Sequence, residues 1–155
     1  MRAVLALAAV ALLAGCASAG SQTTSDPSAR SGSSVPSWPA YHGNGRRSGL
    51  STSMPRVTRH PRVRTTIKLD GQVYASPIVA RGVTIAVTEN NTVYAFSAGF
   101  HLLWKKHLGT PSPASERPCG NIDPLGITGT PLYSAATGLV YLAAEFSGTR
   151  HELFA

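Results

Sequence analysis

The sequence predicts an all-β fold built from a repeated set of short strands. Between residues 73 and 108, runs of β-branched and aromatic residues alternate with turn-forming glycine and asparagine, a pattern typical of antiparallel strands. A second, similar set of runs begins at residue 130 and reaches residue 155. Because short strands in a repeat cannot bury their own faces, each unit needs a neighbour. We therefore expect two related sheets, the second one incomplete.

The two sets of runs correspond in order. Pro77 and Pro131, which open them, are 54 residues apart, whereas a compact four-stranded unit takes about 40–45 residues. A long loop at residues 110–126 accounts for the excess. The corresponding runs are 76–79 with 130–133, 82–87 with 138–143, and 93–95 with 153–155.

Residues 1–15 have the layout of an export signal. The 12 residues 3–14 form one apolar run after a positively charged start, which is too short for a membrane-spanning helix of about 20 residues. Leu13-Ala14-Gly15-Cys16 resembles the lipobox of bacterial lipoproteins, which implies cleavage before Cys16 and acylation of its thiol. An ordinary signal peptide cut after Ala19 is the alternative. We expect an exported protein, lipid-anchored in the bacterial cell membrane or envelope.

Two irregular segments are expected between the signal and the sheets. After the lipidated Cys16, residues up to 37 are rich in serine, glycine, threonine and proline, so residues 16–37 are predicted to be a flexible, disordered linker. Residues 38–62 are predicted to be a lead-in loop. Within it, Trp38 and Tyr41 are expected to pin the chain onto a neighbouring sheet.

The chain is basic, with a formal net charge of +7 and an isoelectric point of about 10.0. Basic clusters can bind nucleic acid, but an exported protein rarely meets it and no aromatic residues run through the arginines, so no nucleic-acid partner is expected. A solvated face and attraction to anionic lipid headgroups or cell-envelope polymers remain as interpretations. The basic stretch comprises Arg46, Arg47, Arg56, Arg59, Arg62, Arg64 and Lys68, with His42 and His60.

The first repeat is expected to begin at residue 63, so that residues 63–155 hold the sheets. Asn90 and Asn91 tolerate positive φ and favour a two-residue loop between the two strands of a hairpin. Pro77 interrupts one strand, where a missing backbone donor indicates an edge or a bulge. The strands are predicted at residues 63–69, 73–79, 83–88, 92–96 and 102–108, with Trp104 at the centre of the last.

The loop at residues 110–126 holds the candidate site residues Cys119, Asn121 and Asp123. Cys119, Asp123 and His107 are residue types that bind metals, but their spacing is not typical of a metal site and no metal ligand is assigned. Cys119 as half of a disulfide requires a partner outside this chain, because Cys16 is expected to be lipidated. Cys119 as a nucleophile requires a positioned base. The remaining interpretation is a packed loop in which Asn121 and Asp123 cap turns.

The first set of runs resembles the repeats of the pyrroloquinoline-quinone-type β-propeller family, through residues 73–79, residues 92–96 and the closing Leu-Leu-Trp-Lys at Trp104. The resemblance implies a partial β-propeller of four-stranded antiparallel blades, about one and a half of them present, with Trp104 stacked between blades. Ser97 stands where the family has an aspartate. Because a closed propeller needs at least four blades, we expect the chain to be the front part of a longer propeller, truncated within its second repeat.

Two function classes follow from this resemblance. The first is a non-enzymatic, lipid-anchored platform for binding or assembly, with envelope proteins or anionic polymers as partners. The alternative is the N-terminal part of a quinoprotein dehydrogenase for alcohols or sugars, which binds pyrroloquinoline quinone and calcium. The departure at Ser97, the lack of an adjacent cysteine pair and the lipid anchor at Cys16 favour the platform. No catalytic or cofactor-binding residue is assigned.

Overall fold

The computed structural model describes residues 37–51 and 60–155. The predicted signal peptide, Cys16, the linker up to residue 36, Arg56 and Arg59 all lie outside these residues. The described part is mostly β-sheet, with two short 3-10 helices, η1 (Tyr41–Gly43) and η2 (Ala114–Glu116). Within it, no helix has both the length and the apolar composition to cross a membrane.

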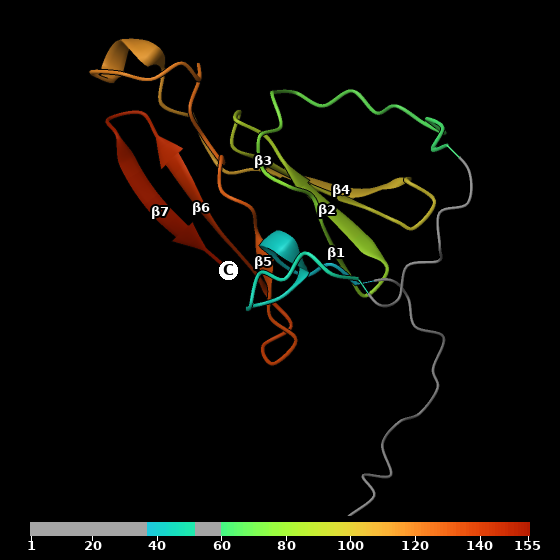
Figure 1. Cartoon of the computed structure of the whole chain (residues 1–155). Helices are drawn as coiled ribbons and strands as arrows, with labels where there is room; N and C mark the ends of the chain where they lie inside the picture. Colours follow the sequence, from blue (N-terminus) through green and yellow to red (C-terminus); the bar gives the residue numbers. More distant parts are fainter. Residues whose placement is uncertain (1–36, 52–59) are drawn as a thin grey trace, which may run out of the picture. The chain divides into compact units, whose positions relative to one another are not determined.

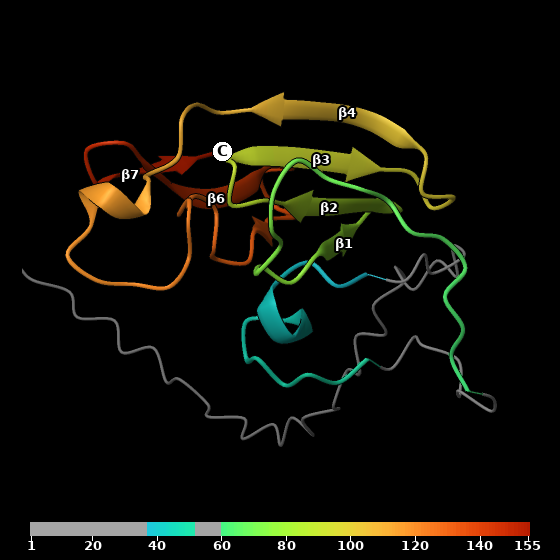
Figure 2. The ribbon, with the colours of Figure 1, turned by 90° about the horizontal axis from the view of Figure 1, so that it is seen from above.

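In the described residues, seven strands form two antiparallel sheets, which confirms the all-β prediction (Figure 1). The first sheet has the strand order β1-β2-β3-β4, and Figure 2 shows these four strands side by side. The second sheet has the order β5-β6-β7. The strands are β1 (Ile78–Ala80), β2 (Val83–Val87), β3 (Thr92–Phe96), β4 (Leu102–His107), β5 (Leu132–Tyr133), β6 (Val140–Phe146) and β7 (Arg150–Phe154).

The β2–β3 hairpin is confirmed, but its loop has three residues and not two. Thr88 N donates to Thr92 O at 3.0 Å, and Asn91 N donates to Thr88 O at 3.1 Å. Asn91 has φ 53, which is the left-handed position that ends a three-residue hairpin loop. Asparagine tolerates this conformation better than most side chains do. Only Asn91 of the Asn90-Asn91 pair therefore takes the positive φ.

The predicted strand at residues 63–69 is wrong. These residues have no strand assignment, and all but Leu69 are exposed. Trp38 already pairs with β1, since Trp38 N donates to Val79 O at 2.7 Å and Trp38 O accepts from Val79 N at 2.9 Å. With that edge taken, the segment lies across one face of the first sheet, where Leu69 packs against a small buried cluster.

The predicted strand at residues 73–79 shortens to β1, because Pro77 has no N–H to donate to a ladder. The lead-in loop behaves partly as expected. Trp38 pins it to β1, and Pro39 O accepts from Tyr133 N at 2.8 Å, so the loop also touches β5. Tyr41 does not pin the loop to a sheet, because its side chain is 48% exposed and stacks on His42.

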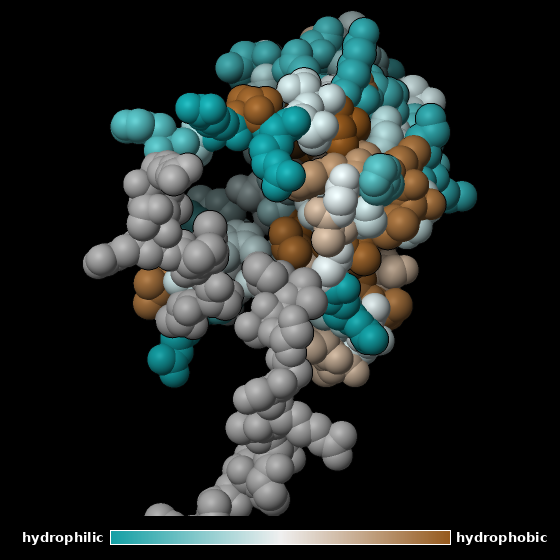
Figure 3. All heavy atoms as spheres, turned by 90° about the vertical axis from the view of Figure 1, so that its right-hand side faces the viewer, coloured by the Kyte–Doolittle hydropathy of each residue, from teal (hydrophilic) through white to brown (hydrophobic). Residues whose placement is uncertain are grey.

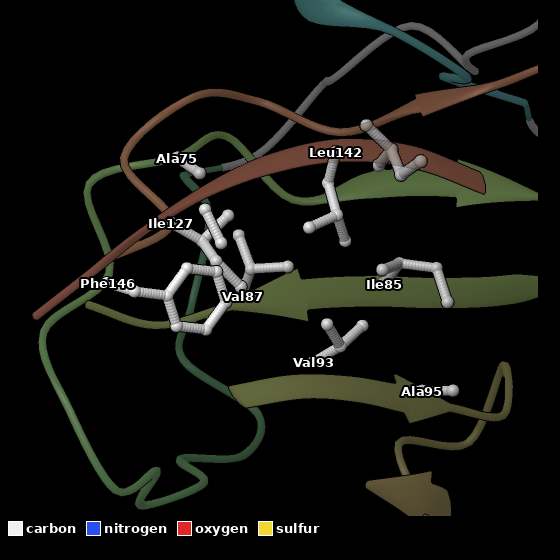
Figure 4. Close-up of a cluster of buried hydrophobic side chains, with 10 residues drawn as sticks. Ala75, Ile85, Val87, Val93, Ala95, Ile127, Leu142 and Phe146 are labelled. Atoms are coloured by element: carbon white, nitrogen blue, oxygen red, sulfur yellow. The ribbon is translucent and has the colours of Figure 1, made fainter. Parts of the chain in front are cut away.

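The core lies between the two sheets. Figure 4 shows Leu142 and Phe146 of β6 facing Val87 and Val93 of the first sheet. Burial of these aliphatic and aromatic side chains is the main favourable term that holds the sheets together. The cluster comprises Ala75, Ile78, Ile85, Val87, Val93, Ala95, Ile127, Leu142, Ala144 and Phe146.

The two sheets have the same orientation, judged by residues that correspond in sequence. In the correspondence of residues 82–87 with 138–143, Ala86 matches Leu142 and Val87 matches Ala143. Val87 faces the second sheet, whereas Ala86 belongs to the cluster on the opposite face of the first. Leu142 faces the first sheet. Matching residues therefore point in the same direction in both sheets, as in a stack of repeated units and not as in two faces turned toward each other.

Candidate functional site

The second sheet has one face against the first sheet and one open face. Ala143 and Leu153 are cross-strand partners on the open face, and Leu153 is 76% exposed. Tyr141 lies on the same face and is partly exposed. The residues of the first sheet that match Tyr141 and Ala143 are Ile85 and Val87, which are buried in the core. The open face of the second sheet thus corresponds in sequence to the face of the first sheet that is covered.

Glu145 lies on this face, but its side chain is buried. It contacts His151 of β7. His151 Nε2 is 3.0 Å from Glu145 Oε2 across the strand pair, and the imidazole is largely exposed. The two side chains line a hollow of about 320 Å³ together with Thr128 and Ala143. A buried carboxylate beside an exposed histidine gives the open face a polar feature for a partner to contact.

Glu89 occupies the matching place in the first sheet, seven residues after Gly82 as Glu145 is after Gly138. Its side chain is 1% exposed. Glu89 Oε2 accepts from Gly126 N at 2.8 Å and from Thr128 Oγ1 at 3.0 Å. Glu89 therefore fastens the first sheet to the segment that leads into the second.

Asn91 adds a second polar link between the sheets, because its Nδ2 donates to Glu145 O at 2.7 Å. Sequence reasoning missed both glutamates. The signal was present, since Glu89 and Glu145 stand at the same distance from the paired glycines, but a charged residue in a strand pattern is normally read as solvent-facing. Glu89 is too deeply buried to meet a substrate, so its role is structural.

The predicted loop residues form no reactive cluster. Cys119 is an exposed free thiol and Asn121 is exposed. Both line a shallow hollow of about 310 Å³ with Arg117. Asp123 Oδ1 accepts from Ala114 N at 2.8 Å, at the start of η2. Asp123 thus holds the start of η2 from across the loop, nine residues away in the sequence.

Across residues 37–51 and 60–155, no three His, Cys, Asp or Glu side chains gather as a metal site requires. The combination of Cys119, Asp123 and His107 is thus not brought together. His107 lies on β4, with its Nδ1 3.2 Å from Thr92 Oγ1. Trp104 is also on β4 and is 49% exposed, beside an edge with no further strand in the described part of the chain.

Asp70 ties the segment before β1 to the β2–β3 hairpin. Its carboxylate accepts from Thr92 Oγ1 at 2.6 Å, Thr88 Oγ1 at 2.8 Å and Asn90 Nδ2 at 3.3 Å. Burial acts to raise the pKa of Asp70, but the hydrogen bonds from Thr92, Thr88 and Asn90 outweigh it and leave the pKa below its ordinary value. These bonds favour the ionised form.

Acid is therefore expected to weaken the fold through Asp70. Since its pKa is lower in the folded than in the unfolded state, its contribution is present above the unfolded value near 4 and is lost as the pH falls through the folded one. Asp70→Asn should lower the free energy of unfolding by about 1 kcal/mol at pH 7. The value is small because this carboxylate is partly exposed to solvent. The variant should also show a smaller further loss between pH 5 and pH 2 than the parent. Urea unfolding as a function of pH measures both.

Glu152→Gln is the matched control, because the Glu152 carboxylate pairs with Arg150 in solvent and such pairs contribute little. Glu116 adds a second acid-sensitive contact. Gly148 N and Ser147 Oγ donate to it and lower its pKa, so Asp70→Asn should reduce the acid response without abolishing it. Identical pH profiles for the parent and Asp70→Asn would show that the carboxylate is not coupled to folding.

Comparison with known proteins gives no relative on which to base a function. No protein-family description matches the chain, no curated protein matches it, and no solved structure matches the fold.

Proposed function

We propose that the chain is a lipid-anchored protein of the bacterial cell envelope, in which stacked propeller-type repeats act as a binding or assembly platform. The resemblance of residues 73–108 to pyrroloquinoline-quinone-type repeats and the lipobox-like sequence at Cys16 motivate this proposal. Two antiparallel sheets stacked in the same sense agree with blades of such a repeat.

The observation that carries the proposal is the open face of the second sheet. Tyr141, Ala143 and Leu153 present apolar surface there, whereas their counterparts in the first sheet are buried by a neighbouring sheet. Exposed apolar surface next to the buried Glu145 suits a protein partner, because interfaces combine an apolar centre with a few placed polar groups. The partner that fits is a sheet of the same repeat type.

A photo-reactive phenylalanine analogue at Leu153 tests this proposal in cells that express the full chain. After irradiation we expect a discrete cross-linked species from the membrane fraction. Cys16→Ser should release the chain from that fraction and reduce the cross-link. The matched control is the same analogue at Leu50, which is 69% exposed but lies on the lead-in loop and not on the open face.

Equal cross-linking from Leu153 and Leu50 would overturn the platform. Membrane retention of the Cys16→Ser chain would overturn the lipid anchor. The dehydrogenase alternative has a separate outcome, because alcohol-dependent dye reduction after addition of pyrroloquinoline quinone and calcium would favour it.

A further inference from the structure

A cavity of about 360 Å³ lies on the face of the first sheet that is turned away from the second. Its floor comes from β2 and β3, and its outer wall comes from the segment at residues 62–69. Ala86 and Phe96 in the floor are buried, and Leu69 packs against them. The lining residues are Arg62, Arg64, Thr65, Ile67, Leu69, Pro77, Thr84, Ala86, Phe96 and Phe100.

The chemistry of the lining has two parts. Ile67, Leu69 and Phe96 make most of the wall apolar, while Arg62 and Arg64 supply two cations. The lining contains no aspartate or glutamate, and neither arginine forms an ion pair with another described residue. Figure 3 shows a side of the molecule on which hydrophobic residues lie exposed among hydrophilic ones.

The size of the cavity limits the ligand. Small-molecule sites take up about 300–1,000 Å³, so this cavity has room for one hydrocarbon chain. A second cavity of about 240 Å³ shares Arg64, Thr65 and Phe100 with it, which leaves space for a headgroup beside Arg64. Guanidinium groups bind carboxylates through paired, charge-assisted hydrogen bonds.

We propose that this cavity binds a single-chain anionic amphiphile, namely a free fatty acid, with the acyl chain against Ala86 and Phe96 and the carboxylate at Arg62 and Arg64. The site is separate from the open face of the second sheet. Fatty-acid binding is therefore an activity beyond the proposed platform function, and it does not require the partner of the open face.

Dodecanoate below its micelle-forming concentration is the probe, titrated into the folded full-length chain and followed by calorimetry. We expect saturable binding with one site. Each methylene removed from the probe should weaken binding about fourfold. Arg62→Ala/Arg64→Ala should weaken binding tenfold or more, which is about the loss of one charged hydrogen bond.

Lys105→Ala/Lys106→Ala is the matched control, because it removes the same charge from exposed positions on β4. It should leave the affinity unchanged. Thr84→Trp is a second, independent variant that fills the cavity from β2 with a residue suited to strands, and it should abolish binding while both arginines remain.

Three results would overturn the proposal. The first is no saturable binding of dodecanoate by the folded chain. The second is equal affinity for dodecyl maltoside, which has the same chain and no charge. The third is equal loss in the arginine and lysine double variants, which would indicate general charge attraction. Binding to phosphatidylglycerol vesicles without binding of free dodecanoate would likewise mean adsorption to a membrane surface and not a fatty-acid site.

Discussion

Gly126→Ala is expected to lower the free energy of unfolding by about 3 kcal/mol or more. A Cβ at this position would lie 2.2 Å from Glu89 O and 2.5 Å from Asn91 Oδ1. Neither atom can withdraw cheaply, because Glu89 O belongs to the backbone and Asn91 is held by its bond to Glu145 O. Overpacking a tight site costs about 1–3 kcal/mol and more where backbone must move. Urea unfolding followed by circular dichroism measures the loss.

Gly129→Ala provides the matched control three residues further along the same segment. A Cβ there meets no atom within 4 Å, so the change should fall within about 0.5 kcal/mol or stabilise slightly by restricting the unfolded chain. Gly126 is not in the left-handed region. Glycine is therefore required here because there is no room for a Cβ, and not because of the backbone conformation. Equal stability of Gly126→Ala and Gly129→Ala would contradict this prediction. It would show that the segment at Gly126 can move away from Glu89 without loss of stability.

Phe146→Ala is expected to destabilise the protein by about 3–5 kcal/mol, the usual range for removing a buried phenylalanine. Phe146 is 6% exposed at the end of β6 and belongs to the cluster between the sheets. Its ring lies 6.0 Å from that of Phe154, measured between centroids. Gly109, just after β4, comes close to the ring, since a Cβ there would lie 3.0 Å from Phe146 Cε1.

The control for Phe146 is Leu153→Ala on the neighbouring strand, where the side chain is largely exposed and truncation should cost less than about 1 kcal/mol. Thermal and urea unfolding measure the stability of both variants. The comparison separates the contribution of the buried face of the second sheet from that of its open face. If Phe146→Ala unfolds at the urea concentration of the parent, then the two sheets are not one cooperative unit.

The β-branched and aromatic residues were enough to predict β2 and β3, because each strand has a hydrophobic run bounded by turn residues. β4 has no β-branched residue and was predicted from its Leu-Leu-Trp run. Residues 63–69 show the limit of that reasoning. Their alternation suits a strand, yet whether a strand forms depends on an open ladder edge, and Trp38 takes the edge of β1. A partner 41 residues away in the sequence cannot be read from local periodicity.

The candidate site was harder to predict, for a different reason. The long loop drew attention to Cys119 and Asp123, whose side chains are solvent-exposed or hold the start of η2. Glu89 does more to hold the sheets together, but this role depends on Gly126 N and Thr128 Oγ1, which come from the segment that leads into the second sheet. Only the paired glycines at 82 and 138 hinted that Glu89 and Glu145 are equivalent.

β4 has a consequence for how the protein behaves at high concentration. It is exposed along its whole length and pairs only with β3 in the described part of the chain. Such an edge is a template for strand-to-strand aggregation, which proteins counter with charge, lysine above all. Leu102, Leu103 and Trp104 favour that association, whereas Lys105 and Lys106 oppose it by repelling an identical edge. The two lysines thus help to keep the protein from aggregating through β4.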